Sequence, residues 1–460
     1  MCGPPYCRSG PRCGAPDAWC GLGRYDEPRG LRICRDRNDP GLGDRGPVTS
    51  KTTYLAPDGR GDGVSALSAA PITDFPSQLG AGDAVLIVTP RGRETHFSWR
   101  KTLADLPVSG SVDAPASIHF ATIGPDGDLD DAPAGYAVAR HSRTEFPRQA
   151  EPDPSGLPFL VLQSPNHARI IGPHFFGAGA KGFYHIAGTA RDLTFSNIDA
   201  RLAGRVIETT DDSNISGLRV SNSRVYGAIR GFARFHHLSD AEFSDLDLDG
   251  AGVDGGGTRV CQMIAVTAGT NLRFRNVYMR RAANLINALE RGSTFVQGDG
   301  IVLEEETSAA VFDNCHARDM GDAGFDMKCD GITLTRCSTA RCKYGVRIWR
   351  AQTENRITAC HFADPKPRPR NAAACLWVGG RVSIDNSILK TAFDTAAIRF
   401  GKGPDTDQPQ AVMTGGAIDV TEGAALLAGE PGQLILNNVR LNGTPTTGVM
   451  QWTGDRLVRG

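Results

Sequence analysis

The sequence predicts an all-β fold, a right-handed, single-stranded parallel β-helix in which the chain winds into stacked coils with loop insertions. Three observations lead to this prediction. Short stretches of alternating apolar and polar residues, typical of strands, return at intervals of 22 to 25 residues. A coil of that length cannot bury its apolar side alone, whereas stacked coils provide a core for one another. No helical periodicity of comparable length competes with this pattern.

Each copy of the repeat is a short alternating strand followed by Asn or a substitute for it. Asn222 lies 25 residues after Asn197, and Arg336 lies 22 residues after Asn314. The recurring Asn predicts an internal ladder at a turn, in which side-chain amides pair with backbone groups. The copies read LTFSNI (Leu193–Ile198), LRVSNS (Leu218–Ser223), AEFSDL (Ala241–Leu246), LRFRNV (Leu272–Val277), AVFDNC (Ala310–Cys315), ITLTRC (Ile332–Cys337), RITAC (Arg356–Cys360), VSIDNS (Val382–Ser387) and LILNNV (Leu434–Val439).

The chain is expected to divide into a leader, a β-helix domain and a tail. Residues 1–50 are rich in Gly, Pro and Arg and are predicted to be disordered. The β-helix is predicted over 51–445, with an N-terminal cap at about 51–100 that holds a first strand, a Gly-rich turn, a short helix near Ser65–Ala70 and a strand within Leu79–Gly92. An Asp/Pro/Arg-rich insertion is expected at about 125–158, and residues 446–460 are predicted to form a C-terminal tail.

The composition limits the partners. The formal net charge is −1, and 40% of the residues are hydrophobic. This balance suits a large core and gives no global attraction to nucleic acid or to a membrane surface. No apolar run approaches the length needed to cross a bilayer. We expect a monomer that binds neither nucleic acid nor a membrane.

The 12 cysteines fall into two groups. Five lie in the leader, and the other seven lie in the predicted β-helix. Cys315, Cys337 and Cys360 are 22 and 23 residues apart and occupy the same place in consecutive coils. Such spacing favours a buried column of small apolar side chains over a disulfide or a zinc site.

Alternation within the strands assigns side chains to the outside of the coils. Asp326 and Lys328 face outward from one coil, Arg347 and Trp349 from the next, and Glu304 from the preceding one. Because strands of adjacent coils lie about 4.8 Å apart, Asp326 and Arg347 are expected to be direct neighbours. The same face is expected to expose Trp377, Arg399, His185, Glu208, Arg234 and His236.

Acidic residues gather at one place on this face. Asp299 and Asp322 are 23 residues apart, and Asp326 follows in the same strand as Asp322. Crowded carboxylates repel one another and favour a hard cation such as Ca²⁺, which makes these three residues candidate metal ligands. Acidic, basic and aromatic side chains together suit an acidic polysaccharide. The residues expected to bind it are Trp349, Trp377, Arg399, Glu304 and His236.

This arrangement resembles the pectate lyase superfamily, and most closely the family nine polysaccharide lyases. In that family an Asp-Gly strand and, one coil later, an Asn-Ser-Asp-Asp-Gly-x-Asp segment bind calcium, and a Gly-Phe-Lys segment supplies the base. By this resemblance Asp299, Asp322 and Asp326 are calcium ligands. Two positions depart from the family pattern: Ala323 replaces the middle aspartate, and Arg347 stands where the lysine is expected.

The resemblance implies a polysaccharide lyase that cleaves a uronic-acid-containing polysaccharide by calcium-assisted β-elimination. Arg347 would remove the C5 proton, and Lys328 is the alternative base, because the pKa of a buried lysine falls more readily. The size of such a substrate favours a secreted or extracytoplasmic protein, although no signal peptide is visible at the N-terminus given.

Three other functions fit the same residues. A glycoside hydrolase would use Asp322 with Asp326, or Glu304 with Asp326, as acid and base. A C5-epimerase would share the proton abstraction and return the proton to the opposite face. A non-catalytic carbohydrate-binding protein of this fold would bind a polysaccharide without turnover. The sequence leaves these alternatives open.

Overall fold

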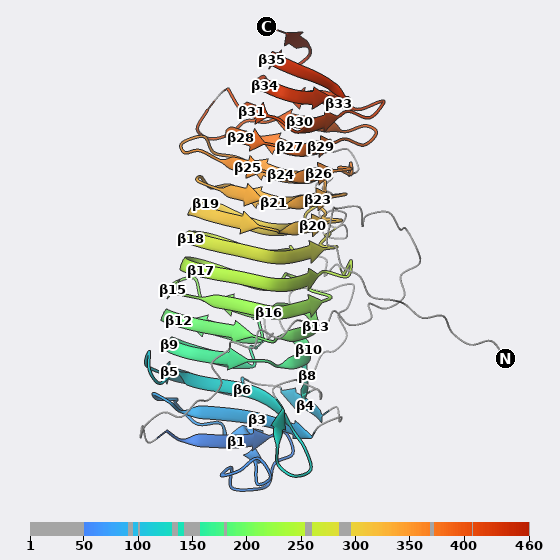
Figure 1. Cartoon of the computed structure of the whole chain (residues 1–460). Helices are drawn as coiled ribbons and strands as arrows, with labels where there is room; N and C mark the ends of the chain where they lie inside the picture. The colour runs from blue at the N-terminus through green and yellow to red at the C-terminus, as the bar shows by residue number, and fades with distance from the viewer. Residues whose placement is uncertain are drawn as a thin grey trace, which may run out of the picture. The chain divides into compact units, whose positions relative to one another are not determined.

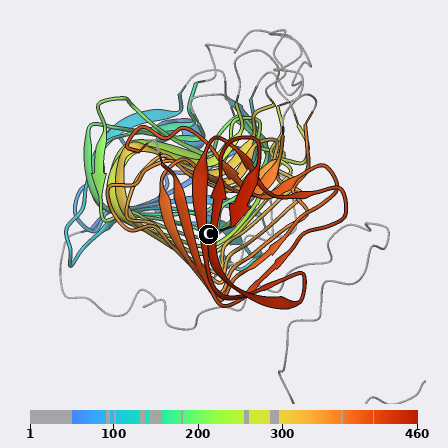
Figure 2. The same cartoon turned by 90° about the horizontal axis from the view of Figure 1, so that it is seen from above.

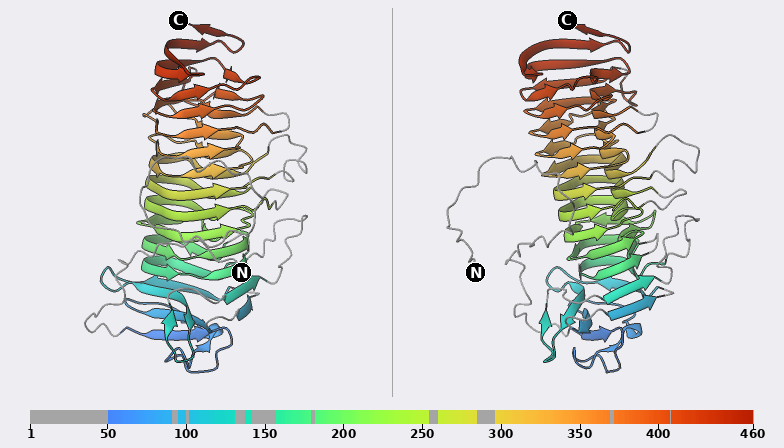
Figure 3. Two further views of the ribbon diagram at one scale, coloured as in Figure 1. Left: turned by 45° about the vertical axis from the view of Figure 1, so that its right-hand side comes forward. Right: turned by 90° about the vertical axis from the view of Figure 1, so that its right-hand side faces the viewer.

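The computed structural model describes residues 50–90, 95–99, 102–130, 137–141, 157–178, 182–253, 260–284, 296–368, 372–406 and 408–459. These residues form a right-handed parallel β-helix, as predicted (Figure 1). A view along the axis shows the coils overlying one another (Figure 2). Two further side views show strands of successive coils side by side (Figure 3). The predicted disordered leader lies outside the described residues.

Each complete coil contributes strands to three faces, and the longest strands bend from one face to the next. The first face is built from β9 (Leu160–Ile171), β11 (Tyr184–Ala187), β14 (Ile207–Thr209), β17 (Ala233–Asp249), β18 (Gln262–Arg280), β19 (Asp299–Asp313), β21 (Ala323–Met327), β24 (Tyr344–Ile348), β27 (Ala374–Val378), β30 (Ala396–Phe400) and β33 (Ala425–Gly429).

The second and third faces continue each coil. The second contains β12 (Thr189–Ser196), β15 (Asn214–Ser216), β16 (Arg219–Tyr226), β22 (Thr333–Thr335), β25 (Arg356–Thr358), β28 (Arg381–Asp385), β31 (Gln410–Thr414) and β34 (Gly432–Leu441). The third contains β10 (His174–Ala178), β13 (Asp199–Ala203), β20 (His316–Arg318), β23 (Ser338–Ala340), β26 (His361–Ala363), β29 (Ile388–Lys390) and β32 (Ala417–Asp419).

The N-terminal end differs from the prediction in one respect. The segment Ser65–Ala70 is not helical; it forms turns, and a short 3₁₀ helix, η1, follows at Ile72–Asp74. Side chains here make local hydrogen bonds: Ser68 Oγ donates to the carboxylate of Asp62, and Ser65 Oγ accepts from the amide of Ser68. Such local bonds compete with helix formation. The strands here are β1 (Thr52–Ala56), β2 (Ala70–Pro71), β3 (Ala84–Pro90), β4 (Thr95–Trp99), β5 (Ala104–Ser109), β6 (Ala116–Ile123), β7 (Leu129–Asp130) and β8 (Ala137–His141).

The insertion predicted at about 125–158 falls largely outside the described residues, which include β7 and β8 within it. The predicted C-terminal tail holds regular structure. Strand β35 (Thr444–Trp452) pairs antiparallel with β34, and β36 (Leu457–Arg459) pairs with β35. These two strands cover the edge that the last parallel strand would otherwise leave open.

The recurring Asn position is a bend, and its ladder is not internal. Asn276 and Asn314, for example, have φ angles of 53°, in the left-handed region that Asn adopts more readily than most residues. Their side chains lie toward the surface and bond to each other and not to the backbone. Asn314 Nδ2 donates to Asn276 Oδ1 at 2.7 Å, and Asn276 Nδ2 donates to Asp245 at 2.8 Å.

The core between the faces is a continuous apolar column, in which Phe243, Phe274 and Phe312 stack with ring centroids 5.0 and 4.7 Å apart. The predicted cysteine column is confirmed, because the seven cysteines among the described residues are all buried and free. Burial raises the pKa of Cys337, a member of this column, so its thiol stays neutral. The column is therefore part of the core.

Candidate active site

Strand register aligns one outward position along the whole first face. Asp326 lies directly beside Arg347, as predicted. His185, Glu208 and Arg234 occupy the same register position further toward the N-terminus, which confirms that they share this face. From β11 to β30 the position is held by His185, Glu208, Arg234, Ala265, Val302, Asp326, Arg347, Trp377 and Arg399.

Near the middle of the face, three carboxyl groups gather around two cations. This acidic cluster consists of Asp299, Asp322 and Asp326 with Lys343 and Arg347. Arg347 Nη1 lies 3.1 Å from Asp322 Oδ2 and 3.6 Å from Asp326 Oδ2. Lys343 Nζ lies 3.1 Å from the other oxygen of Asp322. The side chains of Asp322 and Lys343 are each only 3% exposed, so these charges interact in a strongly desolvated setting.

A backbone amide and an indole N–H donate to two further oxygens of these carboxyl groups. The amide of Ala323 donates to Asp299 Oδ1 at 2.9 Å, and Trp349 Nε1 donates to Asp326 Oδ1 at 2.8 Å. The Arg347 guanidinium stacks over the Trp349 ring, 4.4 Å from its centroid. Its Nε is buried, and none of the described residues accepts a hydrogen bond from it. The arginine is thus held between two carboxylates and an aromatic face.

Burial raises the pKa of two members of the acidic cluster. The pKa of Asp299 lies well above its usual range, and the neighbouring carboxyl groups of Asp322 and Asp326 raise it further. Burial also raises the pKa of Asp322, despite the opposing effects of Arg347 and Lys343. Both shifts favour the protonated forms of these two groups. Buried carboxyl groups with raised pKa values are typical of catalytic sites.

The pKa values of the two cations shift in opposite directions. Burial lowers the pKa of Lys343, although the adjacent Asp322 opposes this effect. Burial alone would also lower the pKa of Arg347, but the carboxylates of Asp326, Asp322 and Asp299 outweigh it and raise the pKa. Arg347 therefore stays charged and is a poor base, in contrast to the role that the sequence suggested for it.

Lys328 and Glu304 lie beside the acidic cluster and pair with each other. Lys328 Nζ lies 2.8 Å from Glu304 and 4.0 Å from Asp326. Burial would lower the pKa of Lys328, but the hydrogen bond to Glu304 and the nearby carboxylates raise it. The ammonium therefore stays protonated, and this pairing does not favour the alternative base role predicted for Lys328.

The donor set does not fit a calcium site. Among the described residues, no three His, Cys, Asp or Glu side chains are arranged to hold one metal ion. Oxygens that would have to bind calcium already face the Lys343 ammonium, the Arg347 guanidinium and the Trp349 indole N–H. Two cations next to Asp322 would also repel a third. We therefore assign no step to a metal.

Aromatic side chains border the acidic cluster on its C-terminal side. The rings of Trp349 and Trp377 lie 4.4 Å apart, and Arg399 follows Trp377 in the register. Trp377 was expected to be exposed, but it is only 8% exposed. Its indole lies so close to Gly401 that a Cβ there would meet it at 2.0 Å. Glycine at 401 thus lets the indole lie flat against the sheet.

Two further residues differ from the sequence-based picture of the site. His236 lies on β17, away from the acidic cluster, where its Nε2 is 3.0 Å from Asp211. Lys343 was missed. It lies in the coil after Asp322, 21 residues further on, and that spacing could have identified it, since its neighbour Tyr344 pairs with Ala323.

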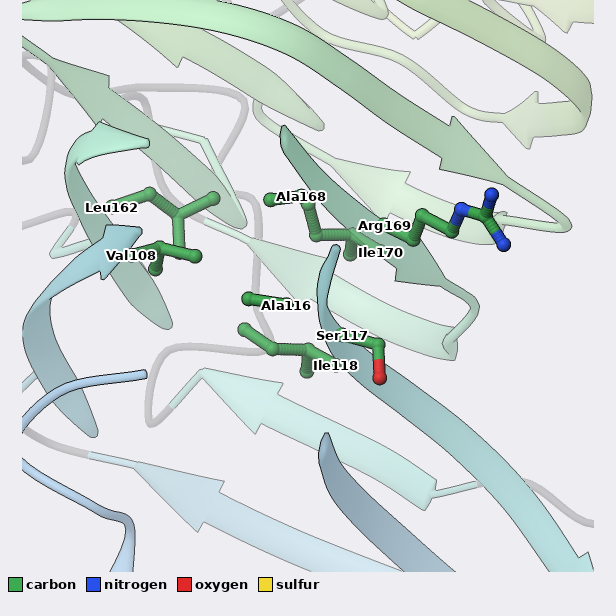
Figure 4. Close-up of a pocket in the computed structure, with 8 residues that line it drawn as sticks. All are labelled: Val108, Ala116, Ser117, Ile118, Leu162, Ala168, Arg169 and Ile170. Carbon is green, nitrogen blue, oxygen red and sulfur yellow. The ribbon is translucent and has the colours of Figure 1, made fainter. Parts of the chain in front are cut away.

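A pocket in the N-terminal coils is unrelated to these residues (Figure 4). Its lining is mostly apolar, and the side chain of Arg169 extends away from the others in this view. It is formed by Val108, Ala116, Ser117, Ile118, Leu162, Ala168, Arg169 and Ile170. We interpret it as a packing gap between coils. In the part of the chain that the structure describes, no helix has the length and apolarity to cross a membrane.

Residues 203–389 match the family model for the right-handed β-helix region. No curated protein matches the sequence. Similar solved structures include a GH136 lacto-N-biosidase from Eubacterium ramulus, with 11% identity over 85% of this chain and 68% of that chain and a TM-score of 0.49. The periplasmic alginate epimerase AlgG, as a double mutant, has 10% identity over 80% and 79% with a TM-score of 0.43, and pectate lyase Pel9A has 12% over 81% and 78% with a TM-score of 0.34.

Proposed function

We propose that the protein is a glycoside hydrolase that acts on a polysaccharide, with Asp322 as general acid/base and Asp326 as nucleophile. The observation that carries this proposal is the geometry of these two carboxyl groups around one guanidinium. Because both Oδ2 atoms lie near the same Arg347 nitrogen, at 3.1 and 3.6 Å, they are no more than about 6.7 Å apart, so nearly the whole range open to them lies below the 6.5–9.5 Å of inverting glycosidases.

The environments of the two groups suit different roles. Burial raises the pKa of Asp322, which favours the protonated form that a general acid needs. Asp326 accepts a hydrogen bond from Trp349 Nε1 at 2.8 Å and lies 3.6 Å from Arg347 Nη1, and these contacts hold its side chain in the orientation that a nucleophile needs. Asp322 would protonate the leaving oxygen as Asp326 bonds to the anomeric carbon. Asp322 would then take a proton from the water that releases the sugar from Asp326.

The short separation predicts retention of anomeric configuration. Inverting enzymes need carboxyl groups about 6.5–9.5 Å apart to admit a water molecule, whereas retaining enzymes hold them about 5–5.5 Å apart. Proton NMR of an oligosaccharide digest should therefore show, as the first product, the same anomer as the cleaved bond. Initial formation of the opposite anomer would exclude Asp326 as a nucleophile.

β-Elimination is the second candidate, and one observation favours it. Burial lowers the pKa of Lys343, which would make this residue a better base than Arg347 or Lys328. Against it, Lys343 and Arg347 already pair with Asp322, which leaves them less able to neutralise the carboxylate of a uronate at the cleavage point. An assay on polysaccharide panels separates the two candidates. Hydrolysis yields saturated reducing ends, whereas elimination yields ultraviolet-absorbing unsaturated uronates.

We predict that activity does not depend on calcium, because Lys343 and Arg347 already neutralise the carboxylates that would bind the ion. Rates of hydrolysis should change by less than about twofold after dialysis against EGTA. Loss of an essential catalytic metal would instead remove several kcal/mol of transition-state stabilisation. Rates would be measured with and without added CaCl₂. If activity is lost in EGTA and added Ca²⁺ restores it, these carboxylates bind calcium and the prediction is wrong.

The proposal extends to the setting in which the protein acts. A polysaccharide substrate favours a secreted or extracytoplasmic location, and we expect a monomer, because one chain supplies every residue of the acidic cluster. Fractionation of the native host and light scattering of the purified protein would test these two expectations.

A further inference from the structure

Three aromatic rings surround the guanidinium of Arg347. Its carbon Cζ lies 4.4 Å from the ring centroid of Trp349, 5.3 Å from that of Trp377 and 5.5 Å from that of Tyr344. The arginine side chain is only 12% exposed. Aromatic faces attract a cation, most strongly where water is excluded. The rings therefore restrict the position of a side chain that contacts two carboxyl groups of the acidic cluster.

The burial of Trp377 does not suit the sugar-binding role that the sequence suggested. Trp377 on β27 lies directly beside Arg347 in the register, and its ring centroid is 4.4 Å from that of Trp349. A residue that stacks on a sugar has to present one face of its ring to the solvent, but Trp377 is only 8% exposed. Most of its surface therefore contacts other parts of the protein.

Two glycines provide the space for the Trp377 indole. Gly379 and Gly401 directly follow β27 and β30 and continue the register position of Trp349. A Cβ at 379 would meet the indole at 2.6 Å, and a Cβ at 401 would meet it at 2.0 Å. Neither glycine has a φ angle in the left-handed region. Space for the ring, and not backbone conformation, therefore requires glycine at these two positions.

We propose that Trp377 is a positioning residue, which holds Arg347 against the carboxyl groups of Asp322 and Asp326 and so maintains the geometry that hydrolysis needs. It acts through the guanidinium and not by binding the sugar. This inference rests on the proposed function, because it takes the two carboxyl groups to be the acid and the nucleophile. Small displacements of such groups reduce the rate strongly, even when the change that causes them lies outside the reacting centre.

Loss of this support is expected to change the protonation of Asp322. Burial raises the pKa of Asp322, and the Arg347 guanidinium opposes this effect, so the pKa should rise further if the guanidinium moves away. Because a general acid has to be protonated, the alkaline limb of the kcat/KM profile should then move to higher pH. The charged or titratable groups that face Asp322 among the described residues are Arg347, Lys343, Arg368, Asp299 and Asp326.

The test compares Trp377→Leu, which removes the ring, with Gly401→Ala, whose Cβ forces the ring out of its place. Both are assayed on a polysaccharide that the wild-type protein cleaves. We expect kcat to fall about ten- to hundredfold and KM to change by less than about twofold, with the alkaline limb at higher pH. Trp377→Phe keeps an aromatic face and should show the same changes to a smaller extent.

A double variant and two controls show whether the effect passes through the indole. Leucine lacks the ring atoms that a Cβ at 401 would meet, so Trp377→Leu with Gly401→Ala should be no slower than Trp377→Leu alone. Trp452→Leu removes a partly buried tryptophan of β35. Gly80→Ala adds a Cβ whose nearest neighbour, an Asp83 carboxylate oxygen, is 3.3 Å away. Both controls should keep the wild-type kcat and pH profile.

Urea denaturation provides a measurement that needs no substrate. The stability that Asp322 contributes is fully present below its unfolded pKa, about 4, and is lost as pH rises through the folded value. A further increase in the folded pKa enlarges that loss. The destabilisation by Trp377→Leu should therefore grow between about pH 4 and pH 7, whereas that by Trp452→Leu should not change with pH.

The inference is overturned if Trp377→Leu folds and keeps the wild-type pH profile, or if its effect and that of Gly401→Ala are additive. Melting curves identify any variant that does not fold, and Trp377→Phe, the smaller change, then gives the result. If the wild-type protein hydrolyses a polysaccharide and Trp377→Leu keeps its pH profile, the inference alone is wrong. If Trp377→Leu shows the pH-dependent loss of stability but none of a broad polysaccharide panel is hydrolysed, the proposed function is wrong.

Discussion

Replacement of Asp326 by Asn is expected to reduce hydrolysis at least about a thousandfold, because the amide cannot form the covalent glycosyl intermediate. The substitution keeps the size of the side chain and an oxygen that can accept the Trp349 N–H, which Asp326 now receives at 2.8 Å. The fold should therefore survive. The initial rate on a polysaccharide that the wild-type protein cleaves measures the loss of hydrolysis. Melting curves show whether the variant is folded.

A matched control and a rescue make this prediction specific. Asp419→Asn changes an exposed aspartate on β32 of the third face and should retain full activity. Asp326→Gly opens space for azide, which should restore cleavage and yield a glycosyl azide with inverted configuration. Activity of Asp326→Asn close to the wild-type rate would contradict the assignment of the nucleophile.

Lys343→Met is expected to lower the free energy of unfolding by about 1–3 kcal/mol at neutral pH, because it removes the polar partner of a buried Asp322 oxygen. Lys343 Nζ lies 3.1 Å from Asp322 Oδ1, and without it Arg347 would be the one charged partner left to Asp322 among the described residues. Urea denaturation followed by circular dichroism measures the effect. Asp322→Asn with Lys343→Met removes both charges and should recover much of the loss.

The loss in Lys343→Met should depend on pH in a defined direction. The folded-state pKa of Asp322 is raised by burial, so the stability that this group contributes is fully present below its unfolded pKa, about 4, and is lost as pH rises through the folded value. Removal of Lys343 raises that pKa further. The destabilisation should therefore grow with rising pH and shrink below about pH 4, where Asp322 is protonated in both states. A loss independent of pH would mean that Lys343 acts only through packing.

The fold and the register of the site could be predicted from the sequence. Asp326 and Arg347 pair as alternation requires, because one face of each strand is buried and a slip by one residue would invert every side chain. The cysteine column was predictable for the same reason. The helix predicted near Ser65–Ala70 is absent, because local hydrogen bonds such as that from Ser68 Oγ to Asp62 favour a non-helical conformation there.

The chemistry of the site was less predictable than its position. Alternation places Arg347 beside acids but does not show that burial and three carboxyl groups together keep it charged. The Lys328–Glu304 pair and the Lys343–Asp322 pair depend on how far each side chain reaches between coils. Trp377 was placed on the outer face correctly, yet its burial depends on Gly401, whose missing Cβ makes room for the ring. Such contacts between coils are set by packing.

Hydrolysis at the acidic cluster is tested most directly by mass spectrometry of products formed in H₂¹⁸O. The proposed mechanism predicts saturated products that carry one ¹⁸O at each new reducing end, and no such products from Asp322→Asn or Asp326→Asn. Products lighter by one water, without ¹⁸O, would show elimination instead. Labelled products from either variant at the wild-type rate would place the reaction elsewhere on the chain.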